Sequence, residues 1–220
     1  MKKYLYLMMV IFILTNCKKS APTLEPEGAE VIELTKSTGI PLSRLSVQFR
    51  EDFIDNRNAW TLQASNPNYT FTIGISGGVY NLNNLSIGAV LGSSSNINFD
   101  QSKNWEIETK ISCDSRTFGF VWNSNPGRLN NVMLFNPNTV DIIEVDQITN
   151  ISTIITSKSV KQLAQNTIKI RRVEDRYYFF INENLIYEGS YFLPKGKISG
   201  YYSLTAGSLQ AEYLQVSYIK

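Results

Sequence analysis

The chain has 220 residues, of which 43% are hydrophobic and 18% charged, and its 21 basic and 19 acidic side chains give a formal net charge of +2. This length is enough for one substantial domain with a large core. The surplus of positive charge is that of Lys2 and Lys3, so the rest of the chain is balanced and a nucleic-acid partner is not expected. Histidine is absent, which excludes Ser-His and Cys-His nucleophilic catalysis and any imidazole metal site.

The first 17 residues predict export. Two lysines precede an unbroken apolar run of 11 residues, 4–14, which is shorter than the roughly 20 residues that span a bilayer and is typical of a secretory leader. Residues 14–17, Leu-Thr-Asn-Cys, resemble the lipobox of bacterial lipoproteins. The resemblance implies that 1–16 is a signal peptide and that Cys17 is acylated, with palmitate among its chains. We therefore expect a lipid-anchored envelope protein of the bacterial outer membrane, and the sequence leaves open whether it faces the periplasm or the cell surface.

Residues 17–46 contain three prolines, acids and bases in equal number, and few large apolar groups. Such a segment buries too little apolar surface to order itself, so we expect a lipidated Cys17 followed by a flexible tether. The folded domain is predicted to span 47–220.

From residue 47 onward, short runs rich in Ile, Val, Tyr, Phe and Thr alternate with Asn, Gly, Ser and Pro. This texture predicts an all-β domain, and so many strands require two sheets. The only helical candidate is a turn or two within 159–165. The expected strands are 47–53, 70–75, 79–82, 87–91, 97–100, 105–113, 117–122, 132–136, 140–145, 151–157, 167–173, 176–181, 185–187, 197–204 and 209–219.

Two segments carry the clearest patterns. In 105–113 every second residue is apolar or small, ending in Cys113, which predicts one face on the core and a buried, unreactive thiol. In 176–187 two apolar runs flank Asn182-Glu183-Asn184, a hairpin whose turn residues tolerate positive φ.

A series of short motifs falls in a familiar order along the domain. They are Phe49-Arg-Glu-Asp-Phe53 with Asn58-Ala-Trp60, Gly78-Val-Tyr80, Asn104-Trp-Glu-Ile-Glu108, Gly119-Phe-Val-Trp122, Lys169-Ile-Arg171 with Tyr178-Phe-Phe-Ile-Asn182, Ile198-Ser-Gly200 and Tyr213-Leu-Gln-Val216. The set resembles the concanavalin A-like lectin/glucanase superfamily, in particular its laminin-G-like domains. The resemblance implies a two-sheet antiparallel jelly-roll sandwich whose concave face often binds glycans, sometimes with calcium, and in some families cleaves them.

Glu106 and Glu108 are the catalytic candidates. Glycosidases use two carboxylates that flank the scissile bond, and residues two apart on a strand share a face about 6.6 Å apart. The glucanases of the resembled superfamily carry a further glutamate on this strand, where the present chain has Lys110 and Ile111. A lysine beside Glu108 also favours the ionised carboxylate, whereas a general acid needs a raised pKa. The sequence therefore favours a solvated strand face over catalysis.

No cofactor is expected, and no acidic stretch has the spacing of a calcium loop. Asp52, near the start of the domain, and Glu212, near its end, are the candidate ligands for a structural calcium ion, because the terminal strands of sandwiches often lie together. Charges on surface turns are the alternative interpretation.

Sugar recognition uses an aromatic platform with planar hydrogen-bonding groups beside it. Such groups occur in Trp122-Asn123-Ser124-Asn125, in Arg128 with Asn130-Asn131, and in Tyr201-Tyr202. Of these, the selected candidate ligand-binding residues are Trp122, Asn123, Arg128, Asn131 and Tyr202. Phe118 and Phe120 share a strand face with Trp122, so a core role for that tryptophan is the alternative.

The leading hypothesis is a non-catalytic, lipid-anchored domain that binds carbohydrate. A glycoside hydrolase and an envelope module that contacts another protein remain the alternatives.

Overall fold

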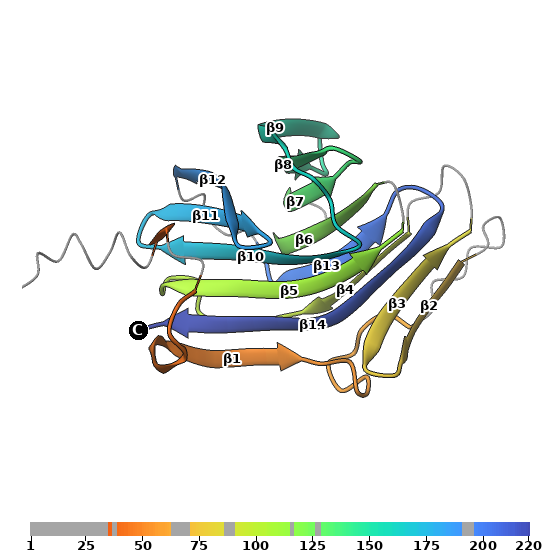
Figure 1. The fold of residues 1–220 in the computed structure, drawn as a ribbon, viewed down its shortest axis with the longest axis horizontal. Helices are drawn as coiled ribbons and strands as arrows, with labels where there is room; N and C mark the ends of the chain where they lie inside the picture. Colours follow the sequence, from red (N-terminus) through yellow and green to blue (C-terminus); the bar gives the residue numbers. More distant parts are fainter. Residues whose placement is uncertain are drawn as a thin grey trace, which may run out of the picture.

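The protein is a sandwich of two antiparallel β-sheets, as the sequence predicts (Figure 1). The computed structural model describes residues 35–36, 39–62, 71–85, 91–114, 117–125, 129–190 and 196–220. The elements are a 3-10 turn η1 (Leu42–Arg44) and the strands β1 (Leu45–Glu51), β2 (Phe71–Ser76), β3 (Val79–Asn84), β4 (Leu91–Asn96), β5 (Trp105–Cys113), β6 (Phe118–Ser124), β7 (Leu129–Phe135), β8 (Thr139–Asp146), β9 (Ile151–Ser159), β10 (Gln165–Val173), β11 (Arg176–Ile181), β12 (Asn184–Ser190), β13 (Ile198–Ser203) and β14 (Gly207–Ile219).

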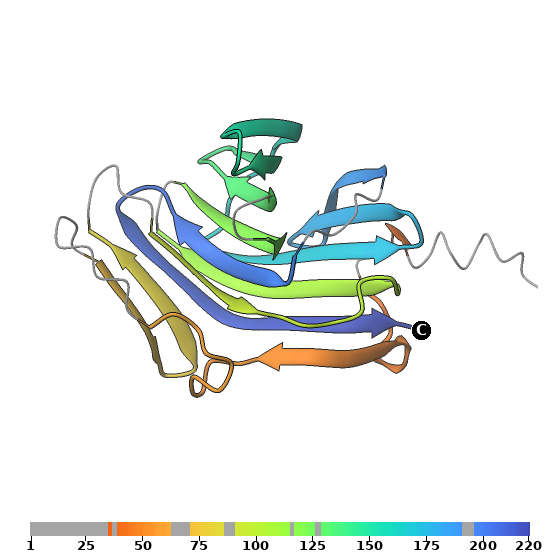
Figure 2. The same cartoon turned by 180° about the vertical axis from the view of Figure 1, so that it is seen from behind.

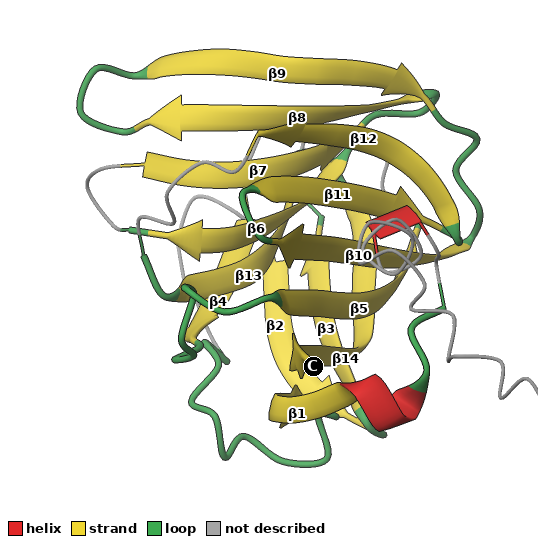
Figure 3. Ribbon diagram, turned by 90° about the vertical axis from the view of Figure 1, so that its left-hand side faces the viewer, coloured by secondary structure: helices red, strands yellow, loops and turns green. Residues whose placement is uncertain are grey.

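The larger sheet has eight strands in the order β12-β11-β10-β5-β14-β3-β2, with β1 also paired to β14. The smaller sheet has six strands in the order β4-β13-β6-β7-β8-β9. Figure 2 shows β5 and β14 extended along the larger sheet, and Figure 3 shows the strands of both sheets in turn, from β9 at the top to β1 at the bottom. In the described part of the chain, no helix is long and apolar enough to cross a membrane.

The core fills the space between the sheets with aromatic and branched aliphatic side chains. On β5, Trp105 and Ile107 face this core and are essentially unexposed, as the alternation in the sequence predicts. Trp60 stacks on Tyr201 with ring centroids 5.7 Å apart, and Cys113 packs at the margin of the same cluster. Such aromatic burial supplies much of the free energy that holds the two layers together.

The domain begins earlier than the sequence predicts. β1 starts at Leu45 and pairs with the end of β14, so that the C-terminus lies beside the start of β1 (Figure 1). Ile40 and Leu45 pack on a second apolar cluster that includes Tyr178 and Phe180 on the outer face of the larger sheet. The segment from Ile40 therefore belongs to the folded domain, because it covers apolar groups that an outer sheet face leaves exposed.

Of three local predictions from the sequence, the structure confirms one and contradicts two. The hairpin turn is confirmed, since Asn182 and Glu183 take positive φ angles of 48° and 67° between β11 and β12. The helix expected at 159–165 is wrong: there, the Asn166 side chain bonds to the backbone of Leu163 and fixes a non-helical connection. The strand expected at 97–100 is also wrong, because the serine-rich β4 before it supplies the pairing to β13.

Candidate functional site

Cross-strand pairing arranges the outer face of the six-stranded sheet in rows. One row runs Ser94, Gly200, Val121, Val132 and Ile143 from β4 to β8. Side chains two apart on a strand point to the same side, so each strand contributes one residue to each neighbouring row. The neighbouring row on this face, two residues away along each strand, is Gly92, Tyr202, Gly119, Leu134 and Asp141.

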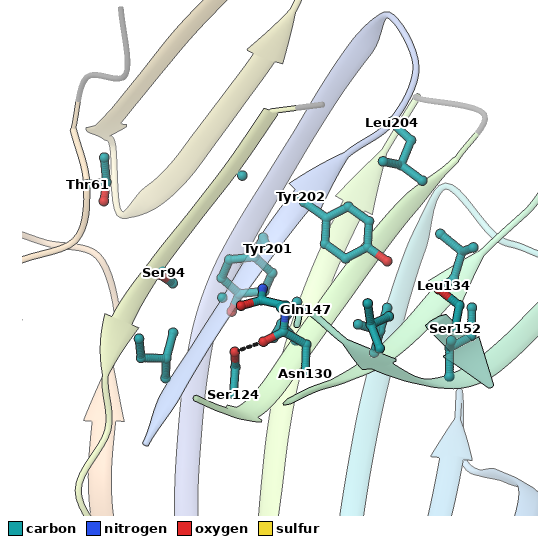
Figure 4. A pocket seen from close by; sticks show the side chains of 17 residues that line it. Thr61, Ser94, Ser124, Asn130, Leu134, Gln147, Ser152, Tyr201, Tyr202 and Leu204 are labelled. Atoms are coloured by element: carbon teal, nitrogen blue, oxygen red, sulfur yellow. Dashed lines mark hydrogen bonds between the residues drawn. The ribbon is translucent and has the colours of Figure 1, made fainter. Parts of the chain in front are cut away.

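This face is hollowed into a groove of about 660 Å³. Its floor is aliphatic, and Thr61, Gln147 and Leu204 contribute to its walls (Figure 4). None of the described side chains that line it is charged. A groove of this size, mostly apolar with a few polar groups, is typical of a small-ligand site.

Tyr201 and Tyr202 both line the groove, but the Tyr201 ring stacks on Trp60 in the core, so Tyr202 is the aromatic platform considered for a ligand. Gly119 lies directly beneath its ring: a Cβ on Gly119 would stand 2.0 to 2.3 Å from three atoms of the Tyr202 ring and hydroxyl. The ring therefore packs against the backbone of β6, and Figure 4 shows it almost face-on within the groove. Burial raises the pKa of the Tyr202 hydroxyl above its ordinary value, so the phenol stays neutral at neutral pH.

A bulge in β6 supplies the polar end of the groove. Trp122 and Asn123 together oppose Ser199 on β13, and Asn123 has a positive φ of 47°. The extra residue reverses the alternation, so Ser124 lines the groove where regular pairing would turn it to the core. There the Ser124 hydroxyl donates a hydrogen bond to the side-chain oxygen of Asn130 on β7 (Figure 4).

Of the five ligand-binding residues expected from the sequence, Tyr202 lies in the groove. Trp122 and Asn131 are corrected to interior positions, since Trp122 is unexposed against Phe179 and Asn131 donates to the Trp122 carbonyl. The Asn123 side chain is buried at the bulge, and neither of its amide atoms has a hydrogen-bond partner among the described residues. Arg128 lies outside the described residues.

Ser124 and Asn130 belong to the candidate stretches in the sequence but are not among the five residues selected from them. The bulge that turns Ser124 outward comes from pairing with β13, which is distant in sequence. The available signal for Asn130 was its position one residue before Asn131, because neighbours on a strand face opposite sides.

Glu106 and Glu108 lie on the outer face of the other sheet, away from the groove. Arg171 donates to Glu106 through Nε at 2.7 Å, and its Nη2 lies 2.6 Å from the same carboxylate oxygen. Glu108 accepts a bond from the Tyr213 hydroxyl and pairs with Lys169 at 3.3 Å. These carboxylates therefore serve ion pairs between strands of the larger sheet.

Burial raises the pKa of the Glu106 carboxyl, although the Arg171 guanidinium beside it opposes the shift. The direction is the one that a general acid needs, but Glu106 is only 5% exposed and fully engaged by Arg171. Its environment is that of a structural ion pair.

The two candidate calcium ligands do not form a described metal site. Glu212 pairs with Lys110 at 2.9 Å and also accepts from Gln165. Asp52 follows β1, which does pair with β14 as expected. Within the described ranges, no group of three or more acidic or cysteine side chains is placed to hold a metal ion.

No protein-family model and no curated protein matches the sequence. The structure, however, is similar to the catalytic domain of an endo-1,3-β-glucanase (laminarinase) from Thermotoga petrophila, with 9% identity, a TM-score of 0.56, and coverage of 80% of this chain and 98% of that one. A Bacillus subtilis protein of unknown function with a galectin-like fold gives 9% identity and a TM-score of 0.60 over 80% and 98% of the two chains. The carbohydrate recognition domain of Emp47p gives 14% identity and a TM-score of 0.55 over 83% and 100%. The fold is therefore the concanavalin A-like jelly-roll sandwich.

Proposed function

We propose that this protein is a lipid-anchored lipoprotein of the cell envelope whose sandwich binds carbohydrate, without cleaving it, in the groove of the six-stranded sheet. The observation that carries the proposal is the ring of Tyr202, which has one face against Gly119 and lies open to the groove. A pyranose has an apolar face that stacks on such a ring and a rim of hydroxyls that needs hydrogen-bonding partners nearby.

The polar groups needed for those hydroxyls lie beside the platform. Ser124, Asn130, Gln147 and Ser152 line the groove from β6 to β9 and are uncharged donors and acceptors. Solved structures of the same fold include proteins described as glucanases and as a carbohydrate recognition domain, which supports this class of ligand.

The chemistry of the described groove lining favours binding over hydrolysis. Glycosidic cleavage takes two carboxyl groups on either side of the bond, and none of the described residues that line the groove is acidic. Asp141, on the neighbouring row, is held by Asn136 at 2.9 Å and by Ser157 at 2.5 Å. A single, hydrogen-bonded carboxylate does not make an acid–nucleophile pair.

A second candidate function, contact with another protein, is favoured by the free edge of the six-stranded sheet. Ile148, Ile151 and Ile154 are 72%, 61% and 60% exposed along β9 and the turn before it. An edge strand with exposed apolar side chains is a typical site for pairing with another chain.

The platform is tested with two glycine substitutions, one beneath the Tyr202 ring and one on the other sheet. Gly119→Ala places a methyl group inside the volume of the Tyr202 ring and displaces it, whereas a Cβ on Gly74, in β2 and outside the groove, meets no atom within 4 Å. On a glycan array followed by calorimetry with the best ligand, we expect Gly119→Ala and Tyr202→Ala to weaken binding at least tenfold, about 1.4 kcal/mol. Gly74→Ala should bind within twofold of wild type. Unchanged affinity in both Gly119→Ala and Tyr202→Ala, or no glycan bound by the folded wild type, contradicts the proposal.

The anchor is tested separately by Cys17→Ser in cells. Thioether acylation needs the sulfur, so we expect the variant to leave the membrane fraction while wild type stays in it after a high-salt wash. Cys113→Ser, which removes the other cysteine of the chain, is the matched control and should remain membrane-bound. A Cys17→Ser protein that still sediments with membranes would refute the lipid anchor.

A further inference from the structure

The groove contains a row of aliphatic side chains, whereas the hydroxyls of an unsubstituted sugar would need polar groups at this position. Val121 on β6, Val132 on β7 and Ile143 on β8 are cross-strand neighbours. They lie side by side on one face of the sheet, and all three line the groove. A sugar hydroxyl placed on this row would lose its water without gaining a hydrogen bond, which is unfavourable. The row therefore favours a ligand that presents a methyl group at this point.

Three kinds of contact follow one another along β6. Gly119 supports the Tyr202 ring, Val121 comes two residues later, and the bulge then turns Ser124 into the groove. Successive residues on one face of a strand are about 6.6 Å apart, so the stacking surface and the polar contact are separated by about 13 Å, the length of a short oligosaccharide, with the apolar contact between them.

The polar contact has a fixed orientation. Because the Ser124 hydroxyl donates to the side-chain oxygen of Asn130, the Asn130 amide nitrogen is the group left to donate to a ligand. Asn130 lies two residues before Val132 on β7, on the side of the sheet that bears the aliphatic row, and lines the groove. An amide N–H is a suitable donor to a carbonyl oxygen.

From these positions we propose that the ligand is an uncharged saccharide bearing an N-acetyl group, an inference that rests on the proposed carbohydrate binding. The pyranose ring of one unit stacks on Tyr202, while a following unit places its acetyl methyl on Val121 and its aliphatic neighbours and its acetyl carbonyl where it accepts a hydrogen bond from Asn130. None of the described residues in the lining is charged, which disfavours uronic acids and sulfated sugars, because their charges would be desolvated without a partner there.

Two tetrasaccharides that differ only at the second carbon test this preference. Chitotetraose carries an N-acetyl group on each glucose unit, and cellotetraose carries a hydroxyl at the same position on the same β-1,4 backbone. By calorimetry on the purified full-length protein, we expect chitotetraose to bind at least tenfold more tightly. Val121→Thr replaces a methyl of the row by a hydroxyl at nearly constant volume and should reduce that ratio at least threefold. Val47→Thr, at a position 53% exposed on β1, is the matched control and should leave it unchanged.

The possible results distinguish the N-acetyl preference from the more general proposal that the groove binds carbohydrate. Equal binding of the two tetrasaccharides, or tighter binding of cellotetraose, overturns the N-acetyl preference while Tyr202-dependent glycan binding stands. The preference is also overturned if neither binds and the glycan array finds a Tyr202-dependent ligand without an N-acetyl group. If the array finds no ligand at all, both proposals fail together. Far-UV circular dichroism and melting curves of Val121→Thr confirm that any change in the ratio is measured on folded protein.

Discussion

Arg171→Met is expected to lower the free energy of unfolding by about 3 to 5 kcal/mol at pH 7, because it leaves a buried carboxylate without its counter-ion. Arg171 is completely buried, and its guanidinium binds Glu106 at 2.6 to 2.7 Å while lying 4.8 Å from the centre of the Phe180 ring. Methionine keeps much of the length and the apolar contact of the arginine stem. Urea denaturation followed by tryptophan fluorescence measures the change.

The loss should depend on pH with a definite sign. Burial already raises the pKa of Glu106, and removal of the neighbouring cation raises it further. A folded pKa above the unfolded value gives stability that is present below the ordinary glutamate pKa of about 4.3 and is lost as the pH rises through the folded pKa. Arg171→Met should therefore be closest to wild type near pH 4 and furthest from it at pH 7.

Two further variants show whether the cost comes from the buried charge. The double variant Glu106→Leu with Arg171→Met removes both charges and should recover most of the lost stability, since apolar replacement of a whole buried pair is often neutral or better. Arg57→Met breaks a pair whose side chains are each 57% exposed, so its unfolding free energy should stay close to that of wild type. If the single and double variants at Arg171 are equally unstable, the loss comes from packing and the ion-pair argument fails.

The fold was predictable because its signals are local. Alternation along β5 identifies the faces of that strand, and Asn182 and Glu183 mark the turn between β11 and β12. The serine-rich β4 lacks such a signal, because backbone pairing to β13 makes it a strand despite its composition. The early start of the domain also escaped prediction, since Ile40 is ordered by a surface that only the assembled larger sheet provides.

The candidate site was less predictable, because long-range pairing and one bulge determine it. Tyr202 could be chosen from its residue type, but nothing in the sequence places Gly119 beneath its ring. Trp122 and Ser124 would share a face on a regular strand, and the bulge at Asn123 separates them into core and groove. Site residues selected on β6 from the sequence alone therefore include side chains that face the core as well as side chains that face the groove.

The placement of Trp122 leads to the second large effect on stability. Trp122 is unexposed in the core, with its ring 5.4 Å from that of Phe179 in an edge-on arrangement. Trp122→Ala opens a cavity between the sheets, and we expect a loss of about 3 to 5 kcal/mol in unfolding free energy. Trp122→Phe retains an aromatic ring and should cost less. Denaturant curves of the three proteins measure both values.

Trp122 and Tyr202 face opposite sides of the six-stranded sheet, so their variants should fail in different ways. Trp122→Phe should lose stability while it binds its ligand normally under conditions where it is folded, because the side chain does not reach the groove. Tyr202→Ala should weaken binding at least tenfold with a smaller loss of stability, because its ring lies in the groove on the outer face of the sheet and not in the core between the sheets. If Trp122→Phe instead abolishes binding without loss of stability, the tryptophan contacts the ligand, and the groove has been assigned to the wrong face of the sheet.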